Sequence, residues 1–169
     1  VKDPNPQSAE HRVKSTEENL ACYAFFNMLY ETTENKRYYT AKENILKWFA
    51  KSGVYDKRKN YFTVGTFQDE VDKTYSLDVN ALAIIILGPQ ILNNQKEPYV
   101  FGGVKTADRL ADSFKKARVE VNYRHPSGST INDVKGYDFT DKEGRPGREA
   151  TVSCEFSAQA ALAYMVLAE

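Results

Sequence analysis

The stretch SLDVNALAIIIL at residues 76–87 decides how the rest of the chain is interpreted. It opens with Ser76, Asp78 and Asn80, continues with seven apolar residues at 81–87, and is followed by Gly88 and Pro89. A helix that is apolar on every face has to be surrounded by other structure, and a glycine followed by a proline is typical of a helix end. The stretch therefore predicts a buried helix that carries polar groups only in its first turn.

Two further stretches open in the same way. The three openings are Ser15-x-Glu17-x-Asn19, Ser76-x-Asp78-x-Asn80 and Ser153-x-Glu155-x-Ser157. Each predicts a helix, at about residues 15–31, 76–87 and 153–168, with the serine as N-cap. A serine cap with an acid in the first turn is ordinary helix capping and stabilises a helix by about 1 kcal/mol. Capping is therefore the plain explanation of each acid taken alone.

Amphipathic and extended segments separate these buried helices. Residues 38–52 and 106–117 place apolar side chains on one face only, which predicts outer helices. Residues 53–75, and residues 118–123 with a second piece up to 140, are typical of extended loops or short β-hairpins. The expected fold is mainly α, made of helical hairpins with the starts of the inner helices at one end. Residues 1–14 are interpreted as a linker or a cut terminus, and residues 15–169 as one helical domain.

Composition excludes several classes of function. The chain has 169 residues with 23 basic and 23 acidic side chains, so no net charge favours nucleic acid. No apolar run approaches the roughly 20 residues that a membrane span needs. His11 and His125 lack metal-ligand spacing, and Asp138 to Glu143 lacks the spacing of a calcium loop, so we expect neither a metal nor a cofactor. Cys22 and Cys154 are interpreted as buried free thiols rather than a disulfide.

The repeated acids suggest a shared site. If the buried helices lie around a common axis, Glu17, Asp78 and Glu155 meet at one rim, where like charge and apolar surroundings separate their pKa values. Glycoside hydrolysis uses such a pair, one protonated acid and one base or nucleophile. Asp78 is the expected base or nucleophile, with Glu17 or Glu155 as the acid. The residues expected to contact a sugar are Asn19, Tyr23, Tyr75, Asn80, Phe139, Phe156 and Gln159.

The motifs together resemble a known family. The strings STEENLACYAFFNMLYETT, SLDVNALAIIILGP, GYDFTD and TVSCEFSAQAALAY resemble bacterial six-hairpin, (α/α)-toroid glycosidase-like proteins over roughly residues 15–164. The resemblance implies an (α/α) barrel with a carbohydrate-facing cavity at the starts of the inner helices, and Glu17, Asp78 and Glu155 match the acids of its motifs. A whole toroid needs about twice the helices expected here, so the sequence predicts an incomplete one.

Three functional hypotheses follow and stay open. The chain is part of a glycoside hydrolase that acts on an oligosaccharide or polysaccharide; or it is a helical module that binds a glycan or a protein and cleaves nothing; or the acids only cap helices in a scaffold fragment. The last helix, residues 153–168, has no outer partner in the sequence. Because exposed apolar area usually marks an interface, we expect self-association or a missing part of a longer chain. The cellular compartment, whether periplasmic, secreted or other, stays undetermined.

Overall fold

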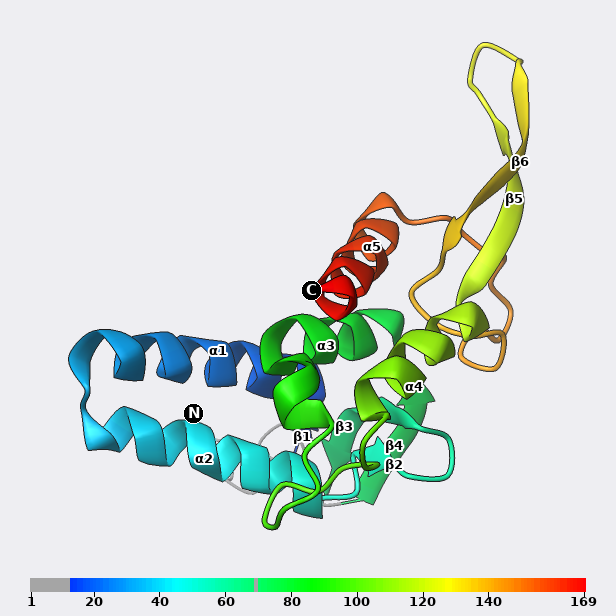
Figure 1. Cartoon of the computed structure of the whole chain (residues 1–169). Helices are drawn as coiled ribbons and strands as arrows, with labels where there is room; N and C mark the ends of the chain where they lie inside the picture. The colour runs from blue at the N-terminus through cyan, green and yellow to red at the C-terminus, as the bar shows by residue number, and fades with distance from the viewer. Residues whose placement is uncertain (1–12, 69) are drawn as a thin grey trace, which may run out of the picture.

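The fold is mixed α and β. The structure, a computed structural model, describes residues 13–68 and 70–169. Of these, 49% lie in helices and 22% in strands, and they form five α-helices and two small sheets (Figure 1). The expectation of a mainly α fold, made of helical hairpins of an incomplete (α/α) toroid, is therefore wrong. The physical reason is that residues 53–75, expected as extended loops or short β-hairpins, pair with residues 13–15 into one four-stranded sheet, and this sheet leads directly into two of the helices.

The five helices lie close to their predicted places. They are α1 (Thr16–Thr33), α2 (Lys36–Lys51), α3 (Leu77–Leu92), α4 (Thr106–Ser113) and α5 (Cys154–Ala168), and a 3₁₀ turn at Phe114–Lys116 extends α4. At the predicted end of α3 the first helical segment stops, as expected, and a second short segment follows after a kink. Gly88 adopts φ 69° there, and the helix continues past Pro89 to Leu92. The glycine supplies a left-handed conformation that other residues rarely adopt.

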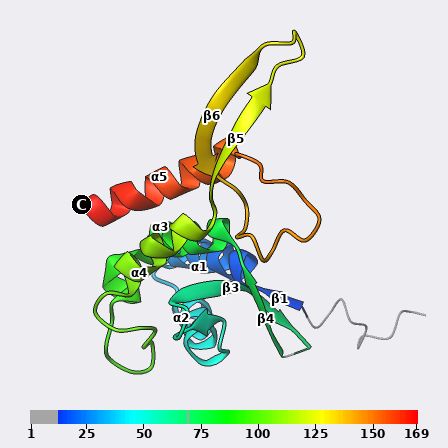
Figure 2. The ribbon, with the colours of Figure 1, turned by 90° about the vertical axis from the view of Figure 1, so that its right-hand side faces the viewer.

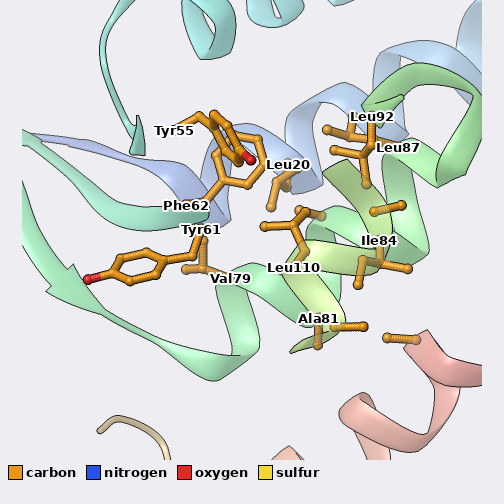
Figure 3. Close-up of a cluster of buried hydrophobic side chains, with 14 of the residues drawn as sticks. Leu20, Tyr55, Tyr61, Phe62, Val79, Ala81, Ile84, Leu87, Leu92 and Leu110 are labelled. Atoms are coloured by element: carbon orange, nitrogen blue, oxygen red, sulfur yellow. The ribbon is translucent and has the colours of Figure 1, made fainter. Parts of the chain in front are cut away.

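Helix α3 is the centre of the structure. It contacts α1, α4 and α5, while α2 lies beside α1 as an antiparallel partner (Figure 1). Its apolar side chains Val79, Ile84 and Leu87 are almost wholly buried. Figure 3 shows them packed with Leu20 of α1 and Leu110 of α4. The prediction that residues 76–87 form a buried helix is therefore confirmed.

A four-stranded sheet joins the starts of α1 and α3. Its strands are β1 (Val13–Ser15), β2 (Tyr55–Asp56), β3 (Tyr61–Phe67) and β4 (Glu70–Tyr75). All pairing in the sheet is antiparallel, and β3 pairs with each of the other three strands. Strand β1 includes residues 13 and 14 of the segment interpreted as a linker, whereas residues 1–12 lie outside the described part of the chain.

The second sheet is a two-stranded hairpin that projects from the rest of the structure (Figure 2). Strand β5 (Arg118–Arg124) pairs antiparallel with β6 (Thr130–Tyr137). The predicted turn between them closes through a hydrogen bond from the His125 N–H to the Ser129 carbonyl, 2.8 Å. The last residue of β6, Tyr137, forms an isolated bridge with Ser153, directly before α5.

Helices α1 and α5 keep much apolar surface in contact with solvent. The exposed large side chains on them are Phe25, Met28, Leu162, Tyr164 and Met165. Cys22 and Cys154 are free thiols, as expected, but both are exposed rather than buried. No helix in the described ranges is both long enough and apolar enough to cross a membrane.

Candidate functional site at the starts of three helices

The three repeated motifs adopt one local geometry. Ser15, Ser76 and Ser153 are all N-caps with extended backbone. Each backbone carbonyl accepts a hydrogen bond from the side chain four residues on: Asn19 Nδ2 at 2.8 Å, Asn80 Nδ2 at 2.7 Å and Ser157 Oγ at 2.7 Å. The repeat in the sequence is therefore a repeat in structure, and the acid between each pair points out of the first turn.

Backbone pairing brings the starts of α1 and α3 together. Strands β1 and β4 both run antiparallel to β3, and each leads directly into a helix. Ser15 pairs with Gly65, and Tyr75 pairs with Thr63, two positions away along β3. At Gly65 an added Cβ would collide with the backbone carbonyl of Lys14, so only glycine allows β1 to lie this close. The sheet thus fixes the acid-bearing turns of both helices side by side.

Residues 137–140, here called the strap, bring the start of α5 to the same place. The Ser153 N–H donates to the Tyr137 carbonyl at 2.9 Å. Two residues on, the Leu77 N–H donates to the Phe139 carbonyl at 2.8 Å, and Thr140 Oγ1 donates to the Tyr75 carbonyl at 2.6 Å. The strap is therefore bonded to the first residues of both α3 and α5.

The charges of Asp78 and Glu155 act on the carboxyl group of Glu17. Partial burial raises the pKa of Glu17, and the negative charges of Asp78, Glu18 and Glu155 raise it further. The Glu17 side chain is still largely exposed, so this desolvation is incomplete. Because electrostatic effects between exposed groups fall off within about 10 Å, Glu17, Asp78 and Glu155 belong to one cluster of like charge.

Asp78 differs from the two glutamates in its surroundings. It is 6% exposed, and its Oδ1 accepts hydrogen bonds from the Ser76 hydroxyl and from the Val79 N–H, the latter at 2.7 Å. Its Oδ2 has no partner among the described residues, and no described lysine or arginine forms an ion pair with it. Glu155, by contrast, is exposed. One fixed buried carboxylate thus lies among more mobile exposed ones.

An aromatic pair lies beside the acids. The rings of Phe139 on the strap and Phe156 on α5 have centroids 5.4 Å apart at an interplanar angle of 49°. Phe139 is 39% exposed although its backbone is bonded to α3, so its ring is available to a ligand. The two predicted tyrosines are different. Tyr23 and Tyr75 are buried in the core, where burial raises the pKa of both hydroxyls, and Tyr75 donates to the Ser113 carbonyl at 3.0 Å.

The predicted amides have mainly structural partners. Asn80 is fully buried, and it clamps β3 through bonds with the Phe62 N–H at 2.8 Å and the Phe62 carbonyl at 2.9 Å. Both N–H donors of its side chain are already hydrogen-bonded, so Asn80 has no free donor to bind a sugar. Asn19 is half-buried and bonded to Ser15. Gln159 is half-buried, and its Oε1 has no hydrogen-bond partner in the described ranges.

Asp138 is an important residue that sequence analysis interpreted as part of a plain turn. It is 2% exposed and pairs with Arg148 at 2.6 Å and with Arg145 at 3.4 Å. It also accepts from the Phe139 N–H at 2.6 Å and from the Thr151 N–H at 2.9 Å. Burial raises its pKa, but the bonds from Arg148 and the two N–H groups outweigh burial, so the pKa lies below its usual value. The signal available in the sequence was an aspartate followed by two arginines, at positions 145 and 148.

Two of the three acids, Glu17 and Glu155, lie on the surface, whereas Asp78 is buried. Five cavities in the described part of the chain have none of the three acids in their linings. The described residues also include no group of three or more His, Cys, Asp or Glu side chains placed to hold a metal ion.

Comparisons with known proteins add no relative. No family model matches the sequence, and no curated protein or solved structure matches the chain.

Proposed function

We propose that the protein acts on a carbohydrate at the starts of α1, α3 and α5. The observation that carries the proposal is the raised pKa of Glu17, which partial burial and the charges of Asp78 and Glu155 cause. A carboxyl group whose pKa is raised, next to one that is fixed and hydrogen-bonded, suits the acid and base roles of glycoside hydrolysis. Phe139 and Phe156 supply apolar rings beside this pair, and such rings pack on the C–H faces of sugars.

The proposed roles follow from the surroundings of each acid. Glu17 is the general acid, because its proton is held to a higher pH than in an ordinary glutamate. Asp78 is the base or nucleophile, because its Oδ1 is held by Ser76 and Val79 and its Oδ2 has no described partner. Glu155 adds negative charge that helps to keep Glu17 protonated and would stabilise positive charge developing on the sugar ring.

A glycan-binding module without catalysis is the second candidate. The exposed positions of Glu17 and Glu155 favour it, and the linings of the described cavities include none of the three acids. Exposed Phe139 would then supply most of the binding, and the acids would accept hydrogen bonds from sugar hydroxyl groups. The third possibility is the scaffold hypothesis, in which the acids only cap helices. The experiment below distinguishes all three.

The test combines hydrolysis and binding on one panel of oligosaccharides. For an enzyme, Asp78→Asn and Glu17→Gln lower the rate about 100-fold or more while affinity persists, since general acid–base catalysis contributes about that factor. Glu18→Gln, in the same turn of α1, is the matched control and keeps most activity. Binding without turnover, lost in Phe139→Ala, supports the module. No binding and no turnover, with only about 1 kcal/mol lost in Asp78→Asn, refutes both proposals in favour of the scaffold.

Self-association, or cover by a further polypeptide segment, also stays a prediction. The exposed apolar residues of α1 and α5, among them Phe25, Met28 and Met165, support it. Sedimentation velocity of this chain should show a concentration-dependent dimer or larger species. A single monomeric species at all concentrations would contradict self-association.

A further inference from the structure

A small basic hollow lies away from the acid cluster. It has a volume of about 170 Å³ and is formed where the turn before β3 meets the end of α4. Four basic side chains line it, against one carboxylate, that of Asp112: Lys59, Arg109, Lys115 and Lys116. The chain as a whole carries equal numbers of basic and acidic residues, so this local excess is a feature of the fold rather than of composition.

Two of the lysines are held on one aromatic ring. Lys59 Nζ and Lys116 Nζ each lie 5.7 Å from the ring centroid of Tyr61. Tyr61 itself is 2% exposed, and Figure 3 shows its ring extending out of the core cluster with the hydroxyl at the outer end. The attraction between a cation and the ring face orders both ammonium groups. The core thus presents two positive charges at a fixed place although both side chains are exposed.

The acids nearby do not neutralise these charges. Neither Lys59 nor Lys116 forms an ion pair within the described part of the chain. Asp56 Oδ1 is occupied by the N–H groups of Arg58 and Lys59, at 2.9 and 3.0 Å. Asp112 pairs with Lys115 at 3.8 Å, and Glu143 acts on Lys59 only as a more distant charge. Each ammonium group carries three N–H donors. A hydrogen bond with Tyr61 and its charge raise the pKa of Lys59, and donors remain on both lysines for a ligand.

Arg109 contributes a third, oriented cation. Its Nη1 donates to the Gly102 carbonyl at 2.9 Å, which directs the guanidinium and leaves its other N–H groups for a ligand. A guanidinium fork binds two oxygens of one group, while lysines bind as compact charges with three donors each. A tetrahedral group with a double negative charge satisfies this set better than a single carboxylate does.

We propose that this hollow binds a phosphate or sulfate group, either as a free ion or as a substituent of a sugar or another small molecule. The proposal does not depend on the carbohydrate function proposed above, because none of the three acids lines the hollow. Its ligand is recognised by Lys59, Lys116 and Arg109, with Tyr61 as the support of the two lysines.

The experiment titrates the protein with inorganic phosphate, sulfate and glucose 6-phosphate at constant ionic strength, with chloride as the blank. Amide NMR shifts are expected to move at residues 59–61 and 113–116. Lys59→Gln with Lys116→Gln should weaken binding about tenfold or more, because each charge-assisted hydrogen bond contributes strongly to affinity. Lys36→Gln with Lys47→Gln, which removes the same charge from exposed positions on α2, is the matched control and should change affinity less than about twofold.

Several outcomes would overturn the proposal. If both double variants weaken anion binding equally, the loss reflects only the change in overall charge. If the amide shifts are confined to other residues, the anion binds elsewhere. An absence of amide shifts with all three anions would exclude the site. Because this titration uses the wild-type chain, its result does not depend on whether a variant folds. Tighter binding of glucose 6-phosphate than of inorganic phosphate would support the proposal and identify a phosphorylated sugar as the ligand. Equal binding would support a simple oxyanion site.

Discussion

Replacing Asp138 by asparagine should strongly destabilise the fold although the two side chains have nearly the same shape. Asp138 is 2% exposed and accepts from Arg148 at 2.6 Å, Arg145 at 3.4 Å, and the N–H groups of Phe139 and Thr151. An asparagine keeps one acceptor oxygen, so the donors facing the other position lose their partner. Each buried donor left unsatisfied costs about 1–3 kcal/mol, and breaking a buried ion pair costs about 3–5 kcal/mol. The Arg148 side chain is 45% exposed and regains water, which reduces the total to about 3–4 kcal/mol.

The measurement is urea unfolding followed by far-UV circular dichroism. With a denaturant slope of about 1–3 kcal/mol per molar urea, the midpoint should fall by about 1–3 M. Glu120→Gln is the matched control, because its pair with Lys135 spans 3.6 Å between side chains that are more than half exposed, and its loss should cost less than about 1 kcal/mol. If Asp138→Asn costs no more than this control, the reasoning that makes Asp138 the anchor of the strap is refuted.

Two further predictions concern stability. Asn80→Leu removes both partners of Phe62 in β3 and should cost about 2–5 kcal/mol in the same unfolding assay; a loss under about 1 kcal/mol would contradict its role as a clamp. Because the pKa of Asp138 is lowered in the fold, its stabilising contribution is fully present above about pH 4 and is lost as the pH falls through the folded pKa. Acid titration of unfolding should therefore show a steeper loss of stability for the wild type than for Asp138→Asn, and parallel curves would refute the assignment.

The helices could be predicted because their signals are local. Ser15, Ser76 and Ser153 were expected as N-caps from spacing alone, and all three occupy the N-cap position. The side chains of Ser15 and Ser153 accept a capping hydrogen bond there, whereas that of Ser76 donates to Asp78 instead. The apolar run at residues 81–87 likewise identified the most buried helix, since periodicity depends only on neighbours in the chain. The end of this run at Gly88 was predicted correctly, because the φ of 69° and ψ of 166° there are not helical, whereas the short helical segment beyond it, which reaches Leu92, was not predicted.

The sheet and its consequences could not be predicted in the same way. Strand β3 reads YFTVGTF and is buried along most of its length, so it lacks the alternation of a half-exposed strand. Its partners lie far away in sequence: Ser15 is fifty positions from Gly65, and no local pattern records that pairing. The same holds for Asp138, whose importance depends on Arg148 and Thr151 folding back onto it. Proximity of the three acids was expected from helix hairpins, whereas strand pairing is what brings Glu17 and Asp78 together.

The strap closes a long loop between the end of β6 and the start of α3. The α1–α2 pair involves residues near one another in sequence, so it forms early, because short loops close quickly. The bond from Leu77 to Phe139 closes a much longer loop and has to wait for it. Phe139 reaches the Glu17 and Asp78 turns only when this loop has closed, and Ser15 reaches Gly65 only when a loop of fifty positions has closed. We therefore expect a nascent chain to bind a ligand at this surface only after both closures.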